Sequence, residues 1–486
     1  MKKRIWIYTI VVGLFVLVIA GVLHIGDLWV ARVPDVPGGT AIAQQPAGDA
    51  LATWRANAAH PVARLIMQLI AIVGVARLFG AFVRWLGQPP VIGEIAAGIA
   101  LGPSLLGVAA PEVSALLFPA SSLGMLQLFS QVGVILFMFV VGLELDWSLV
   151  RTKAHLAVAV SHVSILLPFF LGVVAAISLY GEYAPAGISF HAFGLFMGIA
   201  MSITAFPVLA RILEERGLSK TPIGSTALTC AAVDDVTAWT LLTFVVAVVT
   251  SGGALLVLLV AIGLAIGFVL TMVFGVRPLL GRLLTDSSTR DPFSKDRLAI
   301  VVGVLFASAL ATELIGVHAL FGAFLAGAIM PVNDAFRRGL RDRLESFSSV
   351  FLLPVFFAFT GLRTEIGLLD SAGAWMVCLA LIALATVGKL GGSAITARVM
   401  GLDARTAFAL GALMNTRGLM ELIALNVGYD LGVISPEIFT ALVLMALVTT
   451  SMTGPLVDLA LARHGTAEMA SPTGPKPHVQ SVASDL

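Results

Sequence analysis

Apolar segments follow one another along almost the whole chain, separated by short polar turns. Segments of about 18 or more apolar residues predict transmembrane helices. The predicted spans, with approximate limits, are 5–25, 62–85, 90–109, 122–145, 154–180, 190–213, 222–250, 253–276, 297–316, 318–331, 346–362, 373–398, 403–427 and 435–462. The pattern therefore predicts an all-α polytopic membrane protein with fourteen spans.

The positions of the basic residues support this number of spans. Cytoplasmic loops carry an excess of Lys and Arg, and the chain begins with Lys2, Lys3 and Arg4. The chain has 29 Lys and Arg residues. With the N-terminus in the cytoplasm, the opposite side of the membrane receives only four of them, Arg32, Arg55, Arg64 and Arg363. Removing one internal span would destroy this asymmetry. We therefore expect both termini in the cytoplasm.

The two ends of the chain differ from its middle. Residues 1–25 resemble a signal peptide, but their apolar stretch is too long and the nearest suitable cleavage site too distant, which favours an uncleaved transmembrane anchor. Residues 26–61, rich in Pro, Gly and Ala, are expected to form an external linker. Residues 463–486 are polar and predict a disordered cytoplasmic tail. The transmembrane domain is then expected at 62–462.

Composition excludes an ordinary soluble protein. The chain is 58% hydrophobic and 12% charged, with a mean hydropathy of +1.00, whereas soluble domains are about 25% charged. A net charge of +1 gives no indication of nucleic-acid binding. Cys230 and Cys378 both fall within predicted spans, so no disulfide framework is expected. The spacing of His, Cys and acidic residues suggests no structural metal, and no nucleotide-binding loop or resident cofactor is expected.

Two patterns of the first half of the chain return in the second half. IGEIAAGIALGP (92–103) is similar to IGVHALFGAFLAGAIMP (315–331), and ILFMFVVGLELD (135–146) is similar to LPVFFAFTGLRTEI (353–366). The members of each pair lie seven predicted spans apart, so they cross the membrane in opposite directions. Such inverted repeats occur in many secondary transporters, whose binding sites lie near the midplane between the repeats.

Extending this repeat aligns two spans whose sequences suggest broken helices. The polar or helix-breaking residues are Ser202, Thr204 and Pro207 in the first, and Asn415, Thr416, Arg417, Gly418 and Glu421 in the second. Proline removes a backbone donor and glycine is permissive, so backbone carbonyls can face a cavity. The ends of the half-helices then present partial charges to an ion. The alternative is a kinked packing helix whose Ser and Thr bond to their own backbone.

Charged residues within the spans are candidates for chemistry. Asp234 and Asp235 lie in the middle of an apolar segment, where one charge costs about 2.5–3.5 kcal/mol. Successive helical residues differ by about 100° in direction, so the two carboxylates cannot face the same way. Lys389 is the natural counter-charge. Arg417 and Glu421 are spaced to pair on one helix face, as a structural ion pair or as part of the site.

These residues together resemble the monovalent cation:proton antiporter-2 family over residues 62–462. The resemblance is carried by the segments QPPVIGEIAAGIALGPSLLG, FMFVVGLELD, SITAFPVLARILEERGL, AAVDDVTAW, HALFGAFLAGAIMP and MNTRGLMELIALNVG, the last similar to plant cation/H+ exchangers and Kef-type transporters. It implies a 13-helix cation/proton antiporter fold with inverted repeats, to which 5–25 would add one helix. It also implies a dimerisation subdomain, hence a homodimer, and crossed broken helices at 190–213 and 403–427.

The resemblance also implies roles for the site residues. Asp235 matches the carboxylate that binds cation and proton alternately, and Asp234 matches its neighbour. Lys389 matches the lysine that pairs with this neighbour. Thr204, with Ser202, is expected as an additional ligand at the helix break. The Asp–Asp–Lys pattern is similar to sodium/proton antiporters, whereas the most similar segments resemble potassium exchangers, so Na+ and K+ both stay open.

The sequence therefore predicts an antiporter that exchanges Na+ or K+ for protons by an elevator-type movement, and not an enzyme. We expect an integral protein of a bacterial inner membrane, in contact with lipid and without the regulatory nucleotide-binding domain of Kef-type systems. A Kef-like efflux channel, with the acids as a passive selectivity site, is the alternative. An intramembrane hydrolase ranks last, because it needs two carboxylates that face one substrate.

Overall fold

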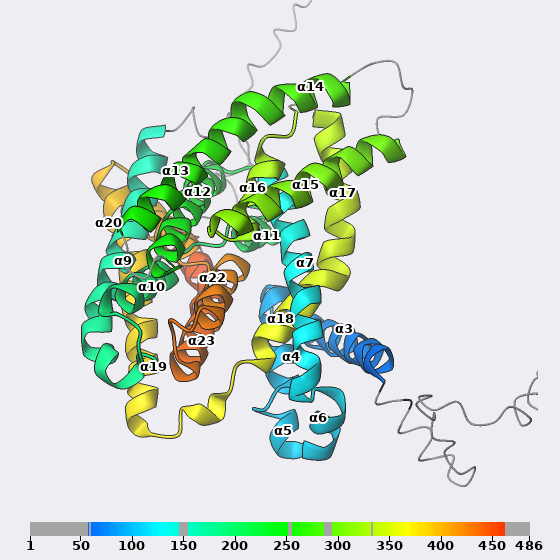
Figure 1. Ribbon diagram of the computed structural model, residues 1–486. Helices are drawn as coiled ribbons and strands as arrows, with labels where there is room; N and C mark the ends of the chain where they lie inside the picture. The colour runs from blue at the N-terminus through cyan, green and yellow to red at the C-terminus, as the bar shows by residue number, and fades with distance from the viewer. Residues whose placement is uncertain are drawn as a thin grey trace, which may run out of the picture. The chain divides into compact units, whose positions relative to one another are not determined.

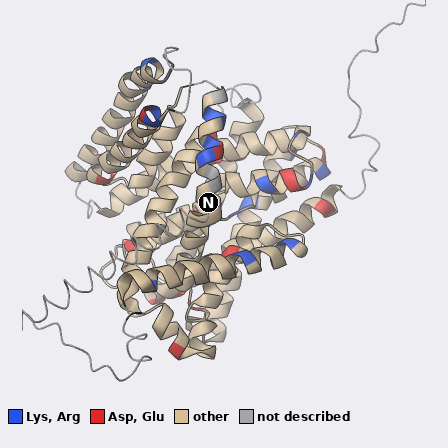
Figure 2. Ribbon diagram, turned by 90° about the vertical axis from the view of Figure 1, so that its right-hand side faces the viewer, with Lys and Arg blue, Asp and Glu red and all other residues tan. Residues whose placement is uncertain are grey.

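The computed structural model of this chain describes residue 57 and residues 60–144, 154–250, 255–285, 294–331 and 334–461. Every regular element in these residues is a helix. Eleven helices are long and apolar enough to cross a membrane, or twelve when the bent pair Ala404–Met414 and Leu419–Asp430 counts as one span. Charged residues occupy only small parts of the ribbon (Figure 2). The prediction of an all-α polytopic membrane protein is thus confirmed.

One predicted span contains only a short helix, and others are untested. The segment 318–331 forms a ten-residue helix, α16 (Ala319–Ala328), which is about 15 Å long and by itself does not cover a hydrocarbon core of about 30 Å. The crossing of the membrane by this segment stays a prediction. The predicted anchor at 5–25 and the tail at 463–486 lie outside the described residues. The count of thirteen core helices therefore stays a prediction.

The described helices form two bundles, each of which combines helices from the first and the second half of the chain (Figure 1). In the first bundle, α4 packs on α3 and α18, and α7 packs on α16 and α18. Its members are α3 (Pro61–Trp85), α4 (Pro90–Leu101), α5 (Leu106–Ala109), α6 (Pro111–Leu117), α7 (Ala120–Glu144), α15 (Lys295–Ile315), α16, α17 (Asp334–Phe347), η2 (Ser348–Leu352) and α18 (Leu353–Leu362).

The second bundle is built around α9, which packs on α10, α12 and α20. Its members are α9 (Ala154–Tyr183), α10 (Phe190–Ser202), α11 (Phe206–Glu215), α12 (Pro222–Thr250), α19 (Ala372–Thr386), η4 (Val387–Gly391), α20 (Gly392–Val399), α21 (Ala404–Met414), α22 (Leu419–Asp430) and α23 (Pro436–Leu461). A long segment connects the bundles through α13 (Leu255–Leu270), η1 (Thr271–Val276) and α14 (Arg277–Thr285), and η3 (Ile366–Leu368) leads back.

Glycines form two equivalent crossings inside the first bundle. A Cβ atom at Gly142 of α7 would overlap with the backbone of α16 at Phe324, and one at Gly327 of α16 would overlap with the backbone of α7. In the same way, Gly361 of α18 leaves no room for a Cβ atom against Gly98 of α4. Each crossing joins one pattern of the first repeat to the opposite pattern of the second. This reciprocal packing is the arrangement expected of inverted repeats.

Candidate functional site

Two interrupted helices meet in the second bundle. The chain leaves α10 at Ser202 and enters α11 at Phe206, and a similar break separates α21 from α22. The backbone N–H of Ala205 donates to the carbonyl of Thr416 at 3.1 Å. The hydroxyl of Thr204 donates to the carbonyl of Met414 at 3.2 Å. The two breaks are therefore bonded to each other through the backbone groups that they free.

Two predicted break residues have more local roles. Pro207 lies in the first turn of α11, where a missing N–H costs nothing, so it starts the second half-helix after the break. The hydroxyl of Ser202 donates to the carbonyls of Gly198 and Ile165, at 2.7 and 3.1 Å. In this structure its hydrogen is thus directed to backbone carbonyls.

Arg417, in the second break, compensates the end of a half-helix. Its fully buried guanidinium donates to the carbonyls of Ala200 and Met201 at the C-terminal end of α10, at 3.2 and 2.6 Å. It also pairs with Glu421 at 2.9 Å. A helix C-terminus carries a negative partial charge, which an adjacent cation stabilises. These contacts favour a structural role for the Arg417–Glu421 pair.

Around Arg417, the remaining break residues are deeply buried. Thr450 of α23 donates to the carbonyl of Arg417 and accepts from its N–H, at 2.9 and 3.0 Å. The hydroxyl of Thr416 donates to the carbonyl of Leu413 at 2.7 Å. Both side-chain amide atoms of Asn415 are buried without a hydrogen-bond partner among the described groups. Most polar groups of this break thus form hydrogen bonds, and the side-chain amide of Asn415 is the exception among the groups named here.

Asp234 is a fully satisfied carboxylate with no exposed surface. Its Oδ1 accepts from Ser161, and its Oδ2 accepts from Ser164 and Thr204 at 3.1 and 2.6 Å. Lys389 Nζ lies 3.4 Å from Oδ2 and is equally buried. A buried charge is tolerated when it is paired and hydrogen-bonded in this way. Both carboxylate oxygens of Asp234 are therefore engaged by donors of the protein.

Lys389 is positioned by an irregular turn. It lies in the π-helical segment η4, and Nζ also donates to the carbonyl and hydroxyl of Ser164, at 3.1 and 2.9 Å. π-Helical turns occur frequently at functional sites. Ser161 and Ser164, which were not predicted from the sequence, both lie on α9. Their spacing of three residues places both on one face of the helix, but this spacing alone does not distinguish them from serines that bond to their own backbone.

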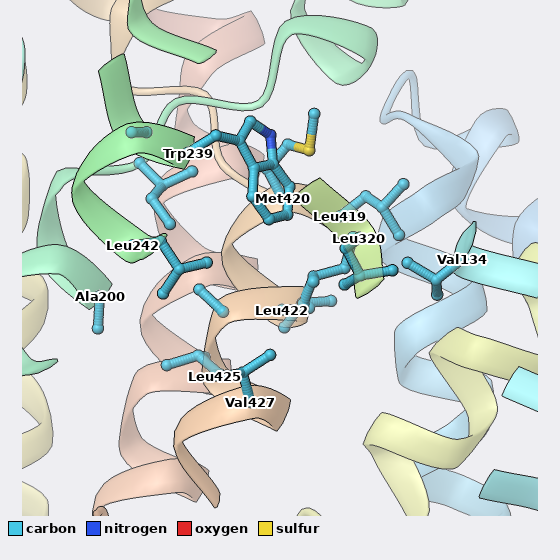
Figure 3. Packing of buried hydrophobic residues seen from close by; sticks show 14 of the residues in the cluster. Val134, Ala200, Trp239, Leu242, Leu320, Leu419, Met420, Leu422, Leu425 and Val427 are labelled. Carbon is cyan, nitrogen blue, oxygen red and sulfur yellow. The ribbon is translucent and has the colours of Figure 1, made fainter. Parts of the chain in front are cut away.

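Asp235 is also buried but, unlike Asp234, has an oxygen without a hydrogen-bond partner among the described groups. It points into a small cavity lined by Ile203, Ala238, Trp239, Leu242 and Met420, with a volume of about 10 Å³, close to the smallest that holds one water molecule. Trp239 and Met420 lie side by side in this wall (Figure 3). The side chain is only 4% exposed, and Oδ1 has no hydrogen-bond partner among the described groups. The backbone N–H of Phe206, at the start of α11, donates to the carboxylate.

The surroundings of Asp235 suit a small monovalent ion. One carboxylate oxygen is free, and the N–H of Phe206 at the positive N-terminal end of a half-helix stabilises the negative charge of the same carboxylate. The described residues contain no group of three or more His, Cys, Asp or Glu side chains that could hold a metal ion. In secondary transporters, backbone carbonyls freed at such helix breaks coordinate Na+ or a proton.

Gly418 is required by the geometry of the second break. Its φ is +149°, and a Cβ atom there would lie 2.9 Å from Val208 Cγ2. We expect Gly418→Ala to lower the free energy of unfolding by about 1–3 kcal/mol, because backbone strain of this kind costs that much. Thermal unfolding in detergent checks this. Gly263→Ala on α13 is the matched control, since no atom lies within 4 Å of its added methyl. Equal unfolding temperatures for both variants would contradict the role of Gly418.

Crossed half-helices beside a buried carboxylate define an integral membrane protein of the secondary ion transporter class. Comparison with known proteins specifies the family. The model described as "Sodium/hydrogen exchanger, transmembrane" matches residues 70–462, and the chain belongs to this family. The resemblance to cation/proton antiporters is thus confirmed.

Relatives carry names of both sodium and potassium exchangers. The Na(+)/H(+) antiporter NhaS4 of Synechocystis is 46% identical, over 81% of this chain and 96% of its own length. Cation/H(+) antiporter 17 of Arabidopsis thaliana is 39% identical over 84% of this chain, and K(+)/H(+) antiporter 1 of Saccharomyces cerevisiae is 33% identical over 83%. This chain spans about half the length of these two, 49% and 47%.

A solved structure has the same fold. The sodium proton antiporter MjNhaP1 from Methanocaldococcus jannaschii superposes with a TM-score of 0.57, covering 82% of this chain and 97% of its own. Its sequence identity is 16%. The match supports the helical architecture described above.

Proposed function

We propose that this protein exchanges a monovalent cation, Na+ or K+, for protons across a membrane. The observation that carries the proposal is Asp235, whose Oδ1 is buried, unpaired and directed into the cavity beside the crossed half-helices. A carboxylate cannot hold a proton and a cation on the same oxygen together, so each ion is released when the other binds. The names of the relatives support this class of transport.

In this proposal the other site residues support Asp235. Asp234 and Lys389 join α12 to α9 and η4 and fix the helix that carries the exchange site. Thr204 binds Asp234 in this conformation and lies in the break next to the cavity residue Ile203, so it is our candidate for an additional ion ligand. Ser202 and Asn415 shape the two breaks. The cation and proton are transported substrates, and no cofactor or enzymatic step is needed.

The proposal extends to the movement and the setting of the protein. We propose that the second bundle carries the ion in an elevator-type movement against the first. The first bundle would hold two copies together as a homodimer surrounded by lipid. We place the protein in a bacterial inner membrane with both termini in the cytoplasm, as the positions of Lys and Arg predict.

Reconstitution tests the function and the ion together. In proteoliposomes, we expect an outward gradient of Na+ or K+ to drive proton uptake, recorded with a pH dye and by electrical measurement on a supported membrane. Separate gradients of each cation identify the substrate. Cation flux that continues without any movement of protons would contradict exchange and favour the channel alternative. Charge movement without a pH gradient would show unequal stoichiometry.

A further inference from the structure

A polar cluster joins the two bundles at one end of α18 and α22. Arg363 Nη1, just after α18, lies 2.8 Å from Asp430 Oδ1 and donates to Asn426 Oδ1 at 3.1 Å. Asn426 in turn donates to the hydroxyl of Thr360 on α18 at 2.8 Å. Gln127 of α7 donates to Asp430 Oδ2 at 3.2 Å. First-bundle residues thus engage the last two turns of α22 from two separate helices.

The packing around Arg363 makes this pair stronger than a pair on an open surface. Its guanidinium carbon lies 4.2 Å from the ring centre of Phe359 and 5.2 Å from that of Tyr429. The side chains of Arg363 and Asp430 are 15% and 34% exposed. Partial desolvation strengthens both the ion pair and the cation–π contacts. The cluster therefore holds one geometry, in which the ends of α18 and α22 are held together.

Between the site and this cluster, the contact between the bundles is apolar. Leu419 and Leu422 of α22 face Leu320 of α16, near Val134 of α7 (Figure 3), and all four belong to one buried hydrophobic cluster. Apolar contacts have no directional bonds, so helices can slide along them without leaving polar groups unpaired. At the opposite end of the bundles, Gln88 donates to the carbonyl of Ser451 at 3.2 Å.

We infer that Arg363 and Asp430, with Asn426, form a latch that closes the outer end of the transport path and must open once in every transport cycle. This inference rests on the proposed function, because only a bundle that moves needs such a contact to break. The positions of Lys and Arg predict that Arg363 lies on the outer side. α22 runs from the central break toward this end, where Asp430 ends it. With the latch closed, Asp235 has no route to the outside.

Accessibility of the path from outside tests the latch without any measurement of exchange. Leu242 lines the Asp235 cavity and lies seven residues, about two turns, farther along α12 toward the predicted outer side. In Leu242→Cys, with Cys230→Ala and Cys378→Ala, we expect Arg363→Gln or Asp430→Asn to raise labelling by an external, membrane-impermeant thiol reagent at least threefold. Arg341→Gln is the control, since Arg341 pairs with Glu144 within the first bundle. Unchanged labelling in both latch variants would overturn the inference.

A reversible cross-link tests whether the latch must open. With Arg363→Cys and Asp430→Cys, a bis(methanethiosulfonate) cross-linker of about the length of an arginine side chain, which forms a disulfide with each cysteine and releases methanesulfinate, should reduce exchange at least tenfold, with recovery on reduction. The control joins Ser104→Cys to Ile366→Cys, because the Ser104 hydroxyl accepts from the Ile366 N–H where α4 meets the end of α18. Full exchange with the link in place, or failure of the two positions to link at all, would overturn the latch.

The two proposals fail in different ways. If the proposed function is wrong, the unmodified protein shows no coupled exchange, whereas labelling of Leu242→Cys still responds to the latch variants. If the latch is wrong, exchange is normal and labelling does not respond. Combining Asp235→Asn with each latch variant separates the two readouts, because labelling requires no ion at Asp235.

Discussion

Replacing Asp235 by Asn should abolish coupled exchange and leave the protein folded. The amide keeps the size of the side chain but has neither the negative charge that attracts a cation nor an oxygen that takes up a proton at neutral pH. Because Asp235 Oδ1 makes no hydrogen bond to the described groups, the substitution breaks no contact at that atom. We expect proton uptake driven by a cation gradient to fall at least a hundredfold in proteoliposomes, with an unchanged unfolding temperature.

The matched control is Asp370→Asn, which changes an exposed acidic residue between η3 and α19. It removes the same charge far from the crossed half-helices, and exchange should continue at the normal rate. Pronounced cation-driven proton uptake by Asp235→Asn would show that the exchange site lies elsewhere. A protein that no longer folds would instead assign Asp235 to stability.

Lys389→Met should destabilise the folded protein more strongly than Gly418→Ala. It leaves Asp234 as a buried carboxylate without its counter-charge, and breaking a buried ion pair in this way costs about 3–5 kcal/mol. We expect a clear decrease of the thermal unfolding temperature in detergent. Lys295→Met, at the exposed start of α15, is the control and should change it little.

The double variant Asp234→Asn, Lys389→Met tests whether the loss of stability comes from the unpaired charge or from the changed side-chain shape. Removing both charges should restore much of the lost stability, since replacing a complete buried ion pair is often neutral. Stability of the single Lys389→Met variant equal to that of the unmodified protein would contradict the ion pair as a structural element. If the double variant folds and exchanges, Asp234 and Lys389 serve only to position Asp235.

Much of the architecture could be predicted from the sequence because membrane solvation allows few solutions. Backbone groups in a bilayer must bond within their own segment, so long apolar segments become helices. The short helix within 318–331 has a local cause. His318 caps α16 at its N-terminus, and the helix ends at Ala328, three residues before Pro331. Hydropathy shows that the segment is apolar but does not give the length of its helix, which is determined by the residues at the two helix ends.

The site was partly predictable for a similar reason. Buried charges such as Asp234, Asp235 and Lys389 are conspicuous in an apolar sequence, and helix geometry required the two aspartates to diverge. The serines that satisfy Asp234 could not be identified, because most Ser and Thr in membrane helices bond to their own backbone. Only the packing of α9 against α12 distinguishes Ser161 and Ser164 from such residues. The cavity likewise depends on which side chains meet there.

The glycine crossings of the first bundle have a consequence for biosynthesis. α4 and α7 are synthesised early, but Gly361 of α18 follows Gly98 by 263 residues and Gly327 of α16 follows Gly142 by 185. Chains emerge from the ribosome N-terminus first, at about 5–20 residues per second. The helix surfaces at Gly98 and Gly142 therefore remain without their packing partners for many seconds after they are synthesised. A ribosome that stalls before Leu353 would leave Gly98 without its partner helix α18, although α16 is already available to Gly142.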